Sequence, residues 1–318
     1  MLFRSADAAV ADPGVDQEVS CPPGRGLLDA DPMSSVPRLT HADAALTHVL
    51  EVLDEFGERR RIAIPAERAL TVFIDKRELV TLMTLGAAPE LLVLGYLRNQ
   101  RLVQGPGDVE SITVDWDVAT AAVKTHNGIV DLEAKTAKRV VTTGCGQGTV
   151  FGDLMDEIDS IALPDASDPS ARLGQGALYR LLNAVRVQES TYKSAGSVHG
   201  CALFRQDEML CFVEDVGRHN AIDTIAGWMW LRGMHGRDKI FYTTGRLTSE
   251  MVIKSAQMEV PIIVSRSGIT QMGFELAQRL GMCLFGRASN RHFICYCGFE
   301  RFDAEPEPSR QSREGSGS

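Results

Sequence analysis

The stretch KIFYTTGRLTSEMVIKSAQMEVPIIVS, residues 239–265, contains the pattern that decides the fold class. The apolar runs at its two ends, KIFYTT and PIIVS, have the length and composition of buried strands. Between them, SEMVIKSAQM has the apolar spacing of an amphipathic helix. Strand, helix and strand in this order predict part of a mixed or parallel sheet with a covering helix.

The same alternation runs through residues 138–302. Strands and helices that alternate in this way predict an α/β domain with a mixed or parallel sheet, covered on both faces. The further strand-like runs are KRVVTT, HGCALF, MLCFVED, MCLFG and HFICYC. The further helical stretches are DPSARLGQGALYRLLNAVRVQ, RHNAIDTIAGWMWLR and TQMGFELAQRL.

A smaller α+β unit is predicted at residues 45–137. Strands with one solvent-facing side are expected at 67–75, 111–117 and 128–133, and a helix at 88–100 behind Pro89. The two ends, residues 1–44 and 303–318, are predicted to be disordered tails, because neither has an apolar period that could offset its ordering entropy.

Composition excludes several classes of protein. The 318 residues carry 33 basic and 42 acidic side chains, a net charge of −9, which argues against nucleic-acid binding. No apolar run is long enough to cross a bilayer, and the start of the chain lacks a signal-peptide pattern, so we expect a cytoplasmic protein. The seven cysteines are expected to be mostly buried, reduced thiols.

One cysteine lies in a glycine-rich turn. The run RVVTTGCGQGT, residues 139–149, places Cys145 between glycines at the end of a predicted strand. Glycines allow a sharp turn and leave the sulfur accessible, and backbone amides ahead of a helix would favour the thiolate. The alternative is a turn under which Cys145 merely packs. Spacing alone does not decide between the two.

A dense polar cluster follows a second predicted strand, in CFVEDVGRHNAID at 211–223. His219 could move protons, Arg218 could hold a phosphate and Asp215 could orient His219. The end of a strand is where α/β folds place ligand groups. The alternative is a helix cap with a salt bridge.

Two further turns have a similar layout. His199 precedes the strand CALF beside small residues, and TTGRLTSE at 243–250 offers Gly245, Arg246 and helix-start amides to an anion. In the structural alternative, Thr248 is an ordinary N-cap.

The segment GRASNRH at 286–292 is predicted to clamp a nucleotide or phosphate, with an ordinary basic hairpin turn as the alternative. His292, Cys295 and Cys297 only weakly suggest zinc. Strand alternation would point both thiols the same way, and no second cysteine pair is near, so we expect no metal site.

Together these motifs resemble the formate dehydrogenase accessory sulfurtransferase family, FdhD. The most specific part is EDVGRHNAID at 214–223, and the resemblance spans about residues 60–302. The other matching stretches are TTGCG at 142–146, GSVHGCALF at 196–204, TTGRLTSEMVIKSAQMEVPIIVSRSG at 243–268 and ELAQRLGMCLFGRA at 275–288.

The resemblance implies a sulfur carrier, a sulfurtransferase that receives persulfide sulfur from a cysteine desulfurase. It passes the sulfur to molybdenum bis(molybdopterin guanine dinucleotide), the cofactor of formate dehydrogenase, as a bound substrate. GDP or GTP would be a partial mimic of that cofactor. The family's main domain has a cytidine deaminase-like three-layer fold with a mixed sheet, beside a smaller N-terminal α+β unit. Members form homodimers.

The resemblance places the persulfide on Cys145 and cofactor binding on the segment from Arg287 to His292. With the reasoning above, the expected catalytic residues are Cys145, His219 and His199. The expected cofactor-binding residues are Arg287, Ala288, Ser289, Asn290, Arg291, His292, Gly245, Arg246, Arg218 and Asp215.

The chain departs from the family pattern twice. Gly148 stands where members commonly have the second cysteine of C-x-x-C, which excludes a relay between two loop cysteines. After Gly286 the basic side chains are Arg287 and Arg291, in a different arrangement from the family's. The single loop cysteine leaves a non-catalytic molybdenum-cofactor chaperone as the main alternative. A zinc nucleobase hydrolase is disfavoured, because H-x-E and P-C-x-x-C are both missing.

Overall fold

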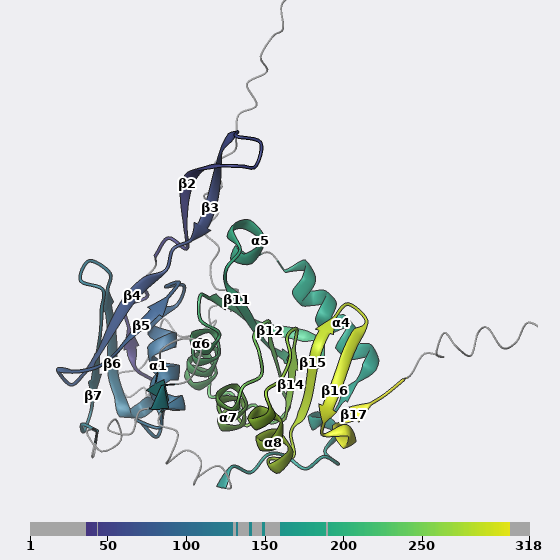
Figure 1. Ribbon diagram of the computed structural model, residues 1–318. Coiled ribbons are helices and arrows are strands. Elements are labelled where there is room, and N and C mark those ends of the chain that lie inside the picture. The colour runs from purple at the N-terminus through teal and green to yellow at the C-terminus, as the bar shows by residue number, and fades with distance from the viewer. Residues whose placement is uncertain are drawn as a thin grey trace, which may run out of the picture.

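The computed structural model describes residues 36–42, 44–129, 160–188 and 190–305, and between the second and third of these ranges also Leu132, Val140–Val141 and Gly148–Thr149. Two sheets stand side by side, with helices α1 (Pro89–Asn99) and α6 (Arg218–Leu231) packed against each other between them (Figure 1). The protein is thus a mixed α/β protein, as the sequence predicts. None of the described helices combines the length and apolar character that crossing a bilayer requires.

The N-terminal sheet has five strands in the order β1-β6-β7-β4-β5, and α1 packs on one of its faces. The sequence analysis assigned Arg38–Leu39 to a disordered tail, but these residues pair with β6 as strand β1. The strand predicted at 128–133 is not formed at 128–129, and the rest of it, apart from Leu132, lies outside the described residues. The other strands are β4 (Arg68–Ile74), β5 (Arg77–Thr84), β6 (Val109–Asp115) and β7 (Thr120–Thr125).

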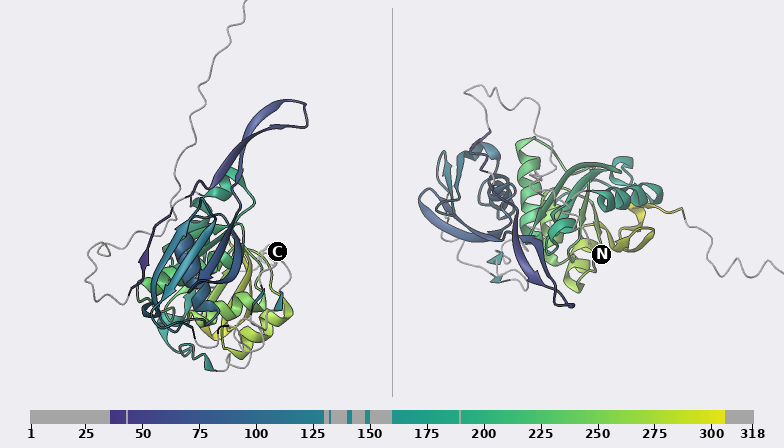
Figure 2. Two further views of the ribbon diagram at one scale, coloured as in Figure 1. Left: turned by 90° about the vertical axis from the view of Figure 1, so that its left-hand side faces the viewer. Right: turned by 90° about the horizontal axis from the view of Figure 1, so that it is seen from above.

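A two-stranded hairpin projects from this unit (Figures 1 and 2). It consists of β2 (Thr47–Leu53) and β3 (Arg59–Pro65), which pair only with each other. Leu53 and, in the turn, Phe56 are exposed.

The main sheet has six strands in the order β12-β11-β13-β14-β15-β16. The three strands β13, β14 and β15 are parallel, and the flanking pairs are antiparallel, so the sheet is mixed as predicted. The strands are β11 (His199–Arg205), β12 (Glu208–Asp215), β13 (Ile240–Thr243), β14 (Ile262–Ser265), β15 (Cys283–Ser289) and β16 (His292–Cys297).

Helices cover both faces of the main sheet. Phe241 and Ile263 face α6, α7 (Ser249–Gln257) and α8 (Gln271–Arg279), whereas Tyr242 and Val264 face α4 (Gln175–Val187). Alternation along each strand therefore divides the apolar side chains between two cores. The remaining elements are α5 (Thr191–Ala195), the 3₁₀ turns Pro106–Asp108, Pro169–Ala171 and Phe299–Arg301, and the short strands β8 (Val140–Val141), β9 (Gly148–Thr149), β10 (Leu173–Gly174) and β17 (Phe302–Asp303).

Strand β17 pairs with β10, so ordered chain extends past the predicted limit at residue 302. Among the described cysteines, Cys201, Cys283, Cys295 and Cys297 are free thiols, as expected. Cys211 is instead disulfide-bonded, so the expectation of a reduced thiol is wrong at that position.

Glycines bring the two units into direct backbone contact where α1 crosses α6. A Cβ on Gly95 would lie 1.6 Å from the carbonyl oxygen of Asp223, and one on Gly227 would lie 2.1 Å from that of Leu91. No side chain fits at either position, so the crossing requires glycine on both helices.

Candidate functional site

One end of the main sheet gathers most of the residues that the sequence analysis singled out. His199 begins β11 and pairs with Asp215 at the end of β12. The parallel strands β13 and β14 end in register at Thr243 and Ser265. The β15–β16 hairpin turns at the same end. We call this end the polar edge; its segments are His199, 215–219, 243–246, 265–267 and 287–292.

Hydrogen bonds join three segments of the polar edge directly. The hydroxyl of Ser265 donates to the carbonyl oxygen of Gly245 at 2.7 Å and accepts from the amide of Ser267 at 2.9 Å. The amide of Arg287 then donates to the carbonyl oxygen of Ser267 at 2.8 Å. The segments of Gly245 and Arg287, distant in sequence, are therefore connected through a single serine turn.

The charges of two arginines act on His199. The side chain of Arg218, which is buried, packs so closely on Gly245 that a Cβ there would lie 2.7 Å from Arg218 Cδ. Burial lowers the pKa of His199, and the charges of Arg218 and Arg246 lower it further. His199 is consequently neutral near pH 7, beside two cations. This electrostatic setting favours an anionic ligand.

Buried polar atoms without a hydrogen-bond partner in the described part of the chain include Arg218 Nε and His219 Nε2 at this edge, and Thr248 Oγ1 just beyond its 243–246 segment. Thr248 is the N-cap residue of α7, but its hydroxyl makes no capping bond. Thr248 therefore occupies the N-cap position, as the structural alternative predicts, but its side chain does not cap the helix.

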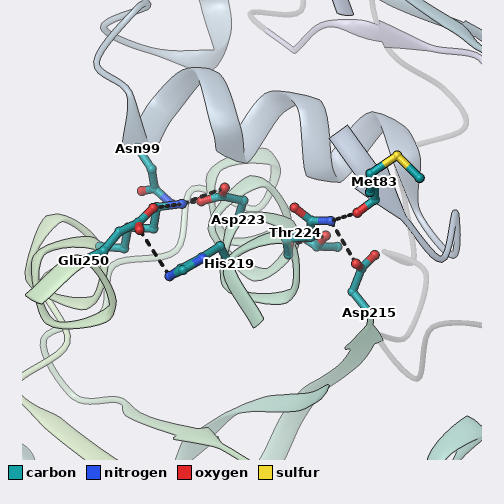
Figure 3. Close-up of polar contacts among 9 residues, drawn as sticks. Met83, Asn99, Asp215, His219, Asp223, Thr224 and Glu250 are labelled. Carbon is teal, nitrogen blue, oxygen red and sulfur yellow. Dashed lines mark hydrogen bonds and ion pairs between the residues drawn. The ribbon is translucent and has the colours of Figure 1, made fainter. Parts of the chain in front are cut away.

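His219 faces a carboxylate from another helix. Its Nε2 lies 3.2 Å from Glu250 Oε2, although the angle is not that of a hydrogen bond. Burial lowers the pKa of His219 to about 3, despite the opposing effect of Glu250. His219 is thus a neutral imidazole enclosed in the core, with its ring directed at Glu250 (Figure 3).

The sequence analysis suggested that Asp215 could orient His219, but the structure gives Asp215 other partners. Its carboxylate accepts hydrogen bonds from the hydroxyl of Thr84 at 2.5 Å, the amide of Gly217 at 3.0 Å and the side-chain amide of Asn220 at 2.8 Å. Burial nevertheless raises the pKa of Asp215 to about 6. Because Thr84 ends β5, Asp215 ties the N-terminal sheet to the start of α6, which is close to the structural alternative of a helix cap.

A buried charge network lies next to His219, and the sequence analysis assigned it no role. Lys254 Nζ lies 2.8 Å from Asp223 Oδ2 and 3.5 Å from Glu250 Oε1, and Asp223 Oδ1 accepts from Asn99 Nδ2 at 2.6 Å (Figure 3). All four side chains are buried. The signal was present as charged residues at core positions of apolar helices, with Glu250 and Lys254 one turn apart.

The predicted cofactor segment forms a tight turn between β15 and β16. Arg287 and Asn290 have positive φ angles, and Ser289 pairs with His292. The guanidinium of Arg291 lies over the ring of Tyr179 on α4, 5.2 Å from its centroid. Ala288 is buried, so the polar members of the segment are the ones available to a ligand.

Cys145 lies outside the described residues. Within the described ranges, no three His, Cys, Asp or Glu side chains are grouped as a metal site requires. Strand alternation predicted that the thiols of Cys295 and Cys297 point to the same face of the sheet, but they point to opposite faces. The register shifts between Leu284 and Phe285, and this β-bulge sends Cys297 to the α7–α8 core while Cys295 packs on the α4 side.

The enclosed His219 predicts acid sensitivity. Below pH 6.5 the unfolded chain takes up a proton at this histidine, whereas the folded state stays neutral until about pH 3. Stability is therefore lost as pH falls through this window, by up to about 1.4 kcal/mol per pH unit. In His219→Asn this loss should be missing, so urea unfolding at about pH 7 and about pH 4.5 should show a shallower decline than in the wild type.

Asp215 also titrates in this pH range, but it does so in the wild type and in His219→Asn alike. Its contribution to the pH dependence of stability therefore cancels when the two are compared. The matched control is His235→Asn, at an exposed histidine, which should decline as steeply as the wild type. Equal slopes for all three proteins would contradict the assignment of a neutral, buried His219.

The amino-acid sequence is similar to those of known proteins. The profile of the FdhD/NarQ family matches residues 65–303. A protein of Listeria innocua named sulfur carrier protein FdhD is 31% identical over 241 residues, covering 75% of this chain and 91% of the relative. The protein of the same name from Bacillus subtilis is 29% identical over 236 residues, covering 74% and 88%.

A solved structure shares the fold. The crystal structure of a protein from Desulfotalea psychrophila, named as a candidate formate dehydrogenase accessory protein, superposes with a TM-score of 0.66 at 23% identity. The match covers 81% of this chain and all of the other chain.

Proposed function

The chain belongs to the FdhD/NarQ family, and from that premise we propose that it is a sulfur carrier that acts in the maturation of formate dehydrogenase. The observation that carries the proposal is the polar edge, where the charges of Arg218 and Arg246 act on the neutral His199 and the Arg287 turn is connected to Gly245 through Ser267 and Ser265. Such a site suits a large anionic ligand with several phosphates.

The proposed reaction uses the thiol of Cys145. Its thiolate attacks the terminal sulfur of a cysteine desulfurase persulfide, the S–S bond breaks, and the desulfurase cysteine leaves as a thiolate. Cys145 then holds the persulfide. On transfer its S–S bond breaks, Cys145 leaves as a thiolate, and the terminal sulfur becomes a sulfide ligand of the molybdenum of bis(molybdopterin guanine dinucleotide), which is bound as substrate and supplies the two electrons from its reduced metal. In this proposal the chain is a sulfurtransferase.

The described residues would bind and orient that substrate. Arg218 Nε and the hydroxyl of Thr248 are unpaired donors suited to a phosphate, and Arg287 and Arg291 would reach the guanine nucleotide ends. His199 is the neutral base at this edge that could accept a proton. GDP or GTP would occupy part of the same site, and the segment from Ala288 to His292 would line it.

His219 acts less directly in this proposal, since it is enclosed and faces Glu250. It would hold the start of α6, and hence Arg218, in place rather than touch the sulfur. The further parts of the proposal are a cytidine deaminase-like main domain, a homodimer and a cytoplasmic location.

Removal of the proposed persulfide thiol is the deciding test. The reduced protein, incubated with a cysteine desulfurase and free cysteine, should gain one sulfur atom on the peptide that contains Cys145. Cys145→Ala should gain none, because no other residue is proposed to carry sulfur. Mass spectrometry of the digested protein measures both. Cys297→Ser, at a buried free thiol, is the matched control and should load as the wild type does.

The single loop cysteine favours one alternative, a cofactor chaperone that moves no sulfur. Complementation of a strain that lacks its own family member separates the two. Cys145→Ala should fail to restore formate oxidation if the chain is a sulfur carrier. Full restoration would establish the chaperone instead, and loading that survives the substitution would remove Cys145 from the mechanism.

A further inference from the structure

Two free thiols touch each other away from the polar edge. Cys283 Sγ on β15 lies 3.9 Å from Cys295 Sγ on β16. Both sulfur atoms lie on the face of the main sheet that α4 covers, beside Phe285 and Phe293. The distance is that of van der Waals contact between sulfur atoms, about 1.9 Å longer than an S–S bond.

The β-bulge creates this contact. Cys295 pairs with Phe285 and Cys297 pairs with Leu284, so Tyr296 is the extra residue of β16. Without the extra residue, Cys295 and Cys297 would share one face. With it, Cys297 points to the opposite core and donates to the carbonyl oxygen of Met282. Among the described thiols, Cys295 is therefore the one that contacts Cys283.

The two thiols differ in the way that a reactive pair requires. Cys283 is fully buried, whereas Cys295 is partly exposed. The hydrogen bond from Cys283 lowers the pKa of Cys295, and the same bond together with burial raises the pKa of Cys283. Burial raises the pKa of Cys297 to about 11. Of this pair, Cys295 is thus the thiol that ionises first and the one that is partly exposed to solvent.

We propose that Cys283 and Cys295 form a redox-active dithiol, which low-molecular-weight disulfides of the glutathione class convert reversibly to a disulfide. The Cys295 thiolate attacks oxidised glutathione, a mixed disulfide forms, and one glutathione thiolate leaves. The Cys283 thiol then loses its proton and attacks Cys295 Sγ, which releases the second glutathione. Overall, two protein thiols are oxidised and one glutathione disulfide is reduced to two thiols.

The position of β16 makes the closure feasible and gives it a consequence. β16 is the last strand of the main sheet, so it pairs with β15 alone and can shift without displacing another strand of that sheet. Arg291 and His292 stand at its beginning. A covalent link between β15 and β16 would restrict the hairpin that presents them.

The test is a peptide map after titration with oxidised glutathione. Trypsin cleaves after Arg279, Arg287, Arg291 and Arg301, so the disulfide would join peptide 280–287 to peptide 292–301. We expect this cross-linked pair in the oxidised wild type, lighter than the two peptides together by two hydrogen atoms, and its loss on reduction. Cys283→Ser should accumulate glutathione on peptide 292–301 instead, because the thiol that resolves the mixed disulfide is missing.

Peptide 292–301 contains two cysteines, and substitutions decide which one reacts. Cys295→Ser should abolish the cross-link, and Cys297→Ser, the matched control two residues along the same strand, should keep it. The proposal is overturned if the wild type gives no cross-link, or if the cross-link survives in Cys295→Ser and disappears in Cys297→Ser. None of these outcomes depends on Cys145, so the proposed sulfur transfer stands or fails separately.

Discussion

Replacement of Gly95 by alanine is expected to destabilise the protein by about 3 kcal/mol or more. The added methyl group would lie 1.6 Å from the carbonyl oxygen of Asp223 and 2.7 Å from the amide nitrogen of Gly227. Both atoms belong to the backbone of α6, so relief requires α1 and α6 to move apart. That movement would open the contact between the two units. Urea unfolding followed by circular dichroism measures the loss.

Gly268→Ala is the matched control. A Cβ at Gly268 has no neighbouring atom within 4 Å, and its backbone needs no positive φ. We expect its stability to stay within about 0.5 kcal/mol of the wild type. Comparable losses in both variants would show that the helix crossing tolerates a side chain and that the packing described here is wrong.

Lys254→Met is expected to cost about 3–5 kcal/mol, because it removes one partner from a buried ion pair. Methionine retains most of the side-chain length, so the effect isolates the charge. Asp223 and Glu250 would remain in the core without their shared cation. Desolvation already raises the pKa of Asp223, which opposes the effect of Lys254. The same unfolding experiment detects the change.

A second substitution tests the cause. Asp223→Asn added to Lys254→Met removes a buried charge and should recover part of the lost stability, since contacting residues are not additive. The side chain of Asn99 remains as a neighbour at that position. If the double variant is less stable than the sum of the two single losses, the ion pair is not what stabilises this core.

Much of the fold follows from periodicity. The helices at α1, α6, α7 and α8 and the six strands of the main sheet are confirmed close to their predicted bounds, because each buries one apolar face or run. The projecting hairpin was not predicted. Most side chains of β2 and β3 are exposed, so their sequence lacks the alternation of buried and exposed residues that predicts a strand. The tail limit at residue 44 was wrong, because the pairing of Arg38–Leu39 with β6 depends on a strand seventy residues away.

The site was predictable in its position and less so in its contacts. Polar residues that follow parallel strands lie at one end of a sheet, and Arg218 and Gly245 are in contact there. The pairing of side chains depends on their distances in the folded structure, which the spacing of residues along the sequence does not determine. His219 therefore faces Glu250 rather than Asp215, and one extra residue at Tyr296 reverses the direction of Cys297.

The carboxylates of Asp215, at the end of β12, and Asp223, in α6, have a consequence for the chain as a whole. Asp215 accepts a hydrogen bond from Thr84, and Asp223 accepts one from Asn99. Both donors belong to the N-terminal unit. Severed from that unit, the second half would hold two buried acids with part of their solvation missing. We therefore expect the two halves, although each has its own sheet and apolar interior, to unfold in a single cooperative transition.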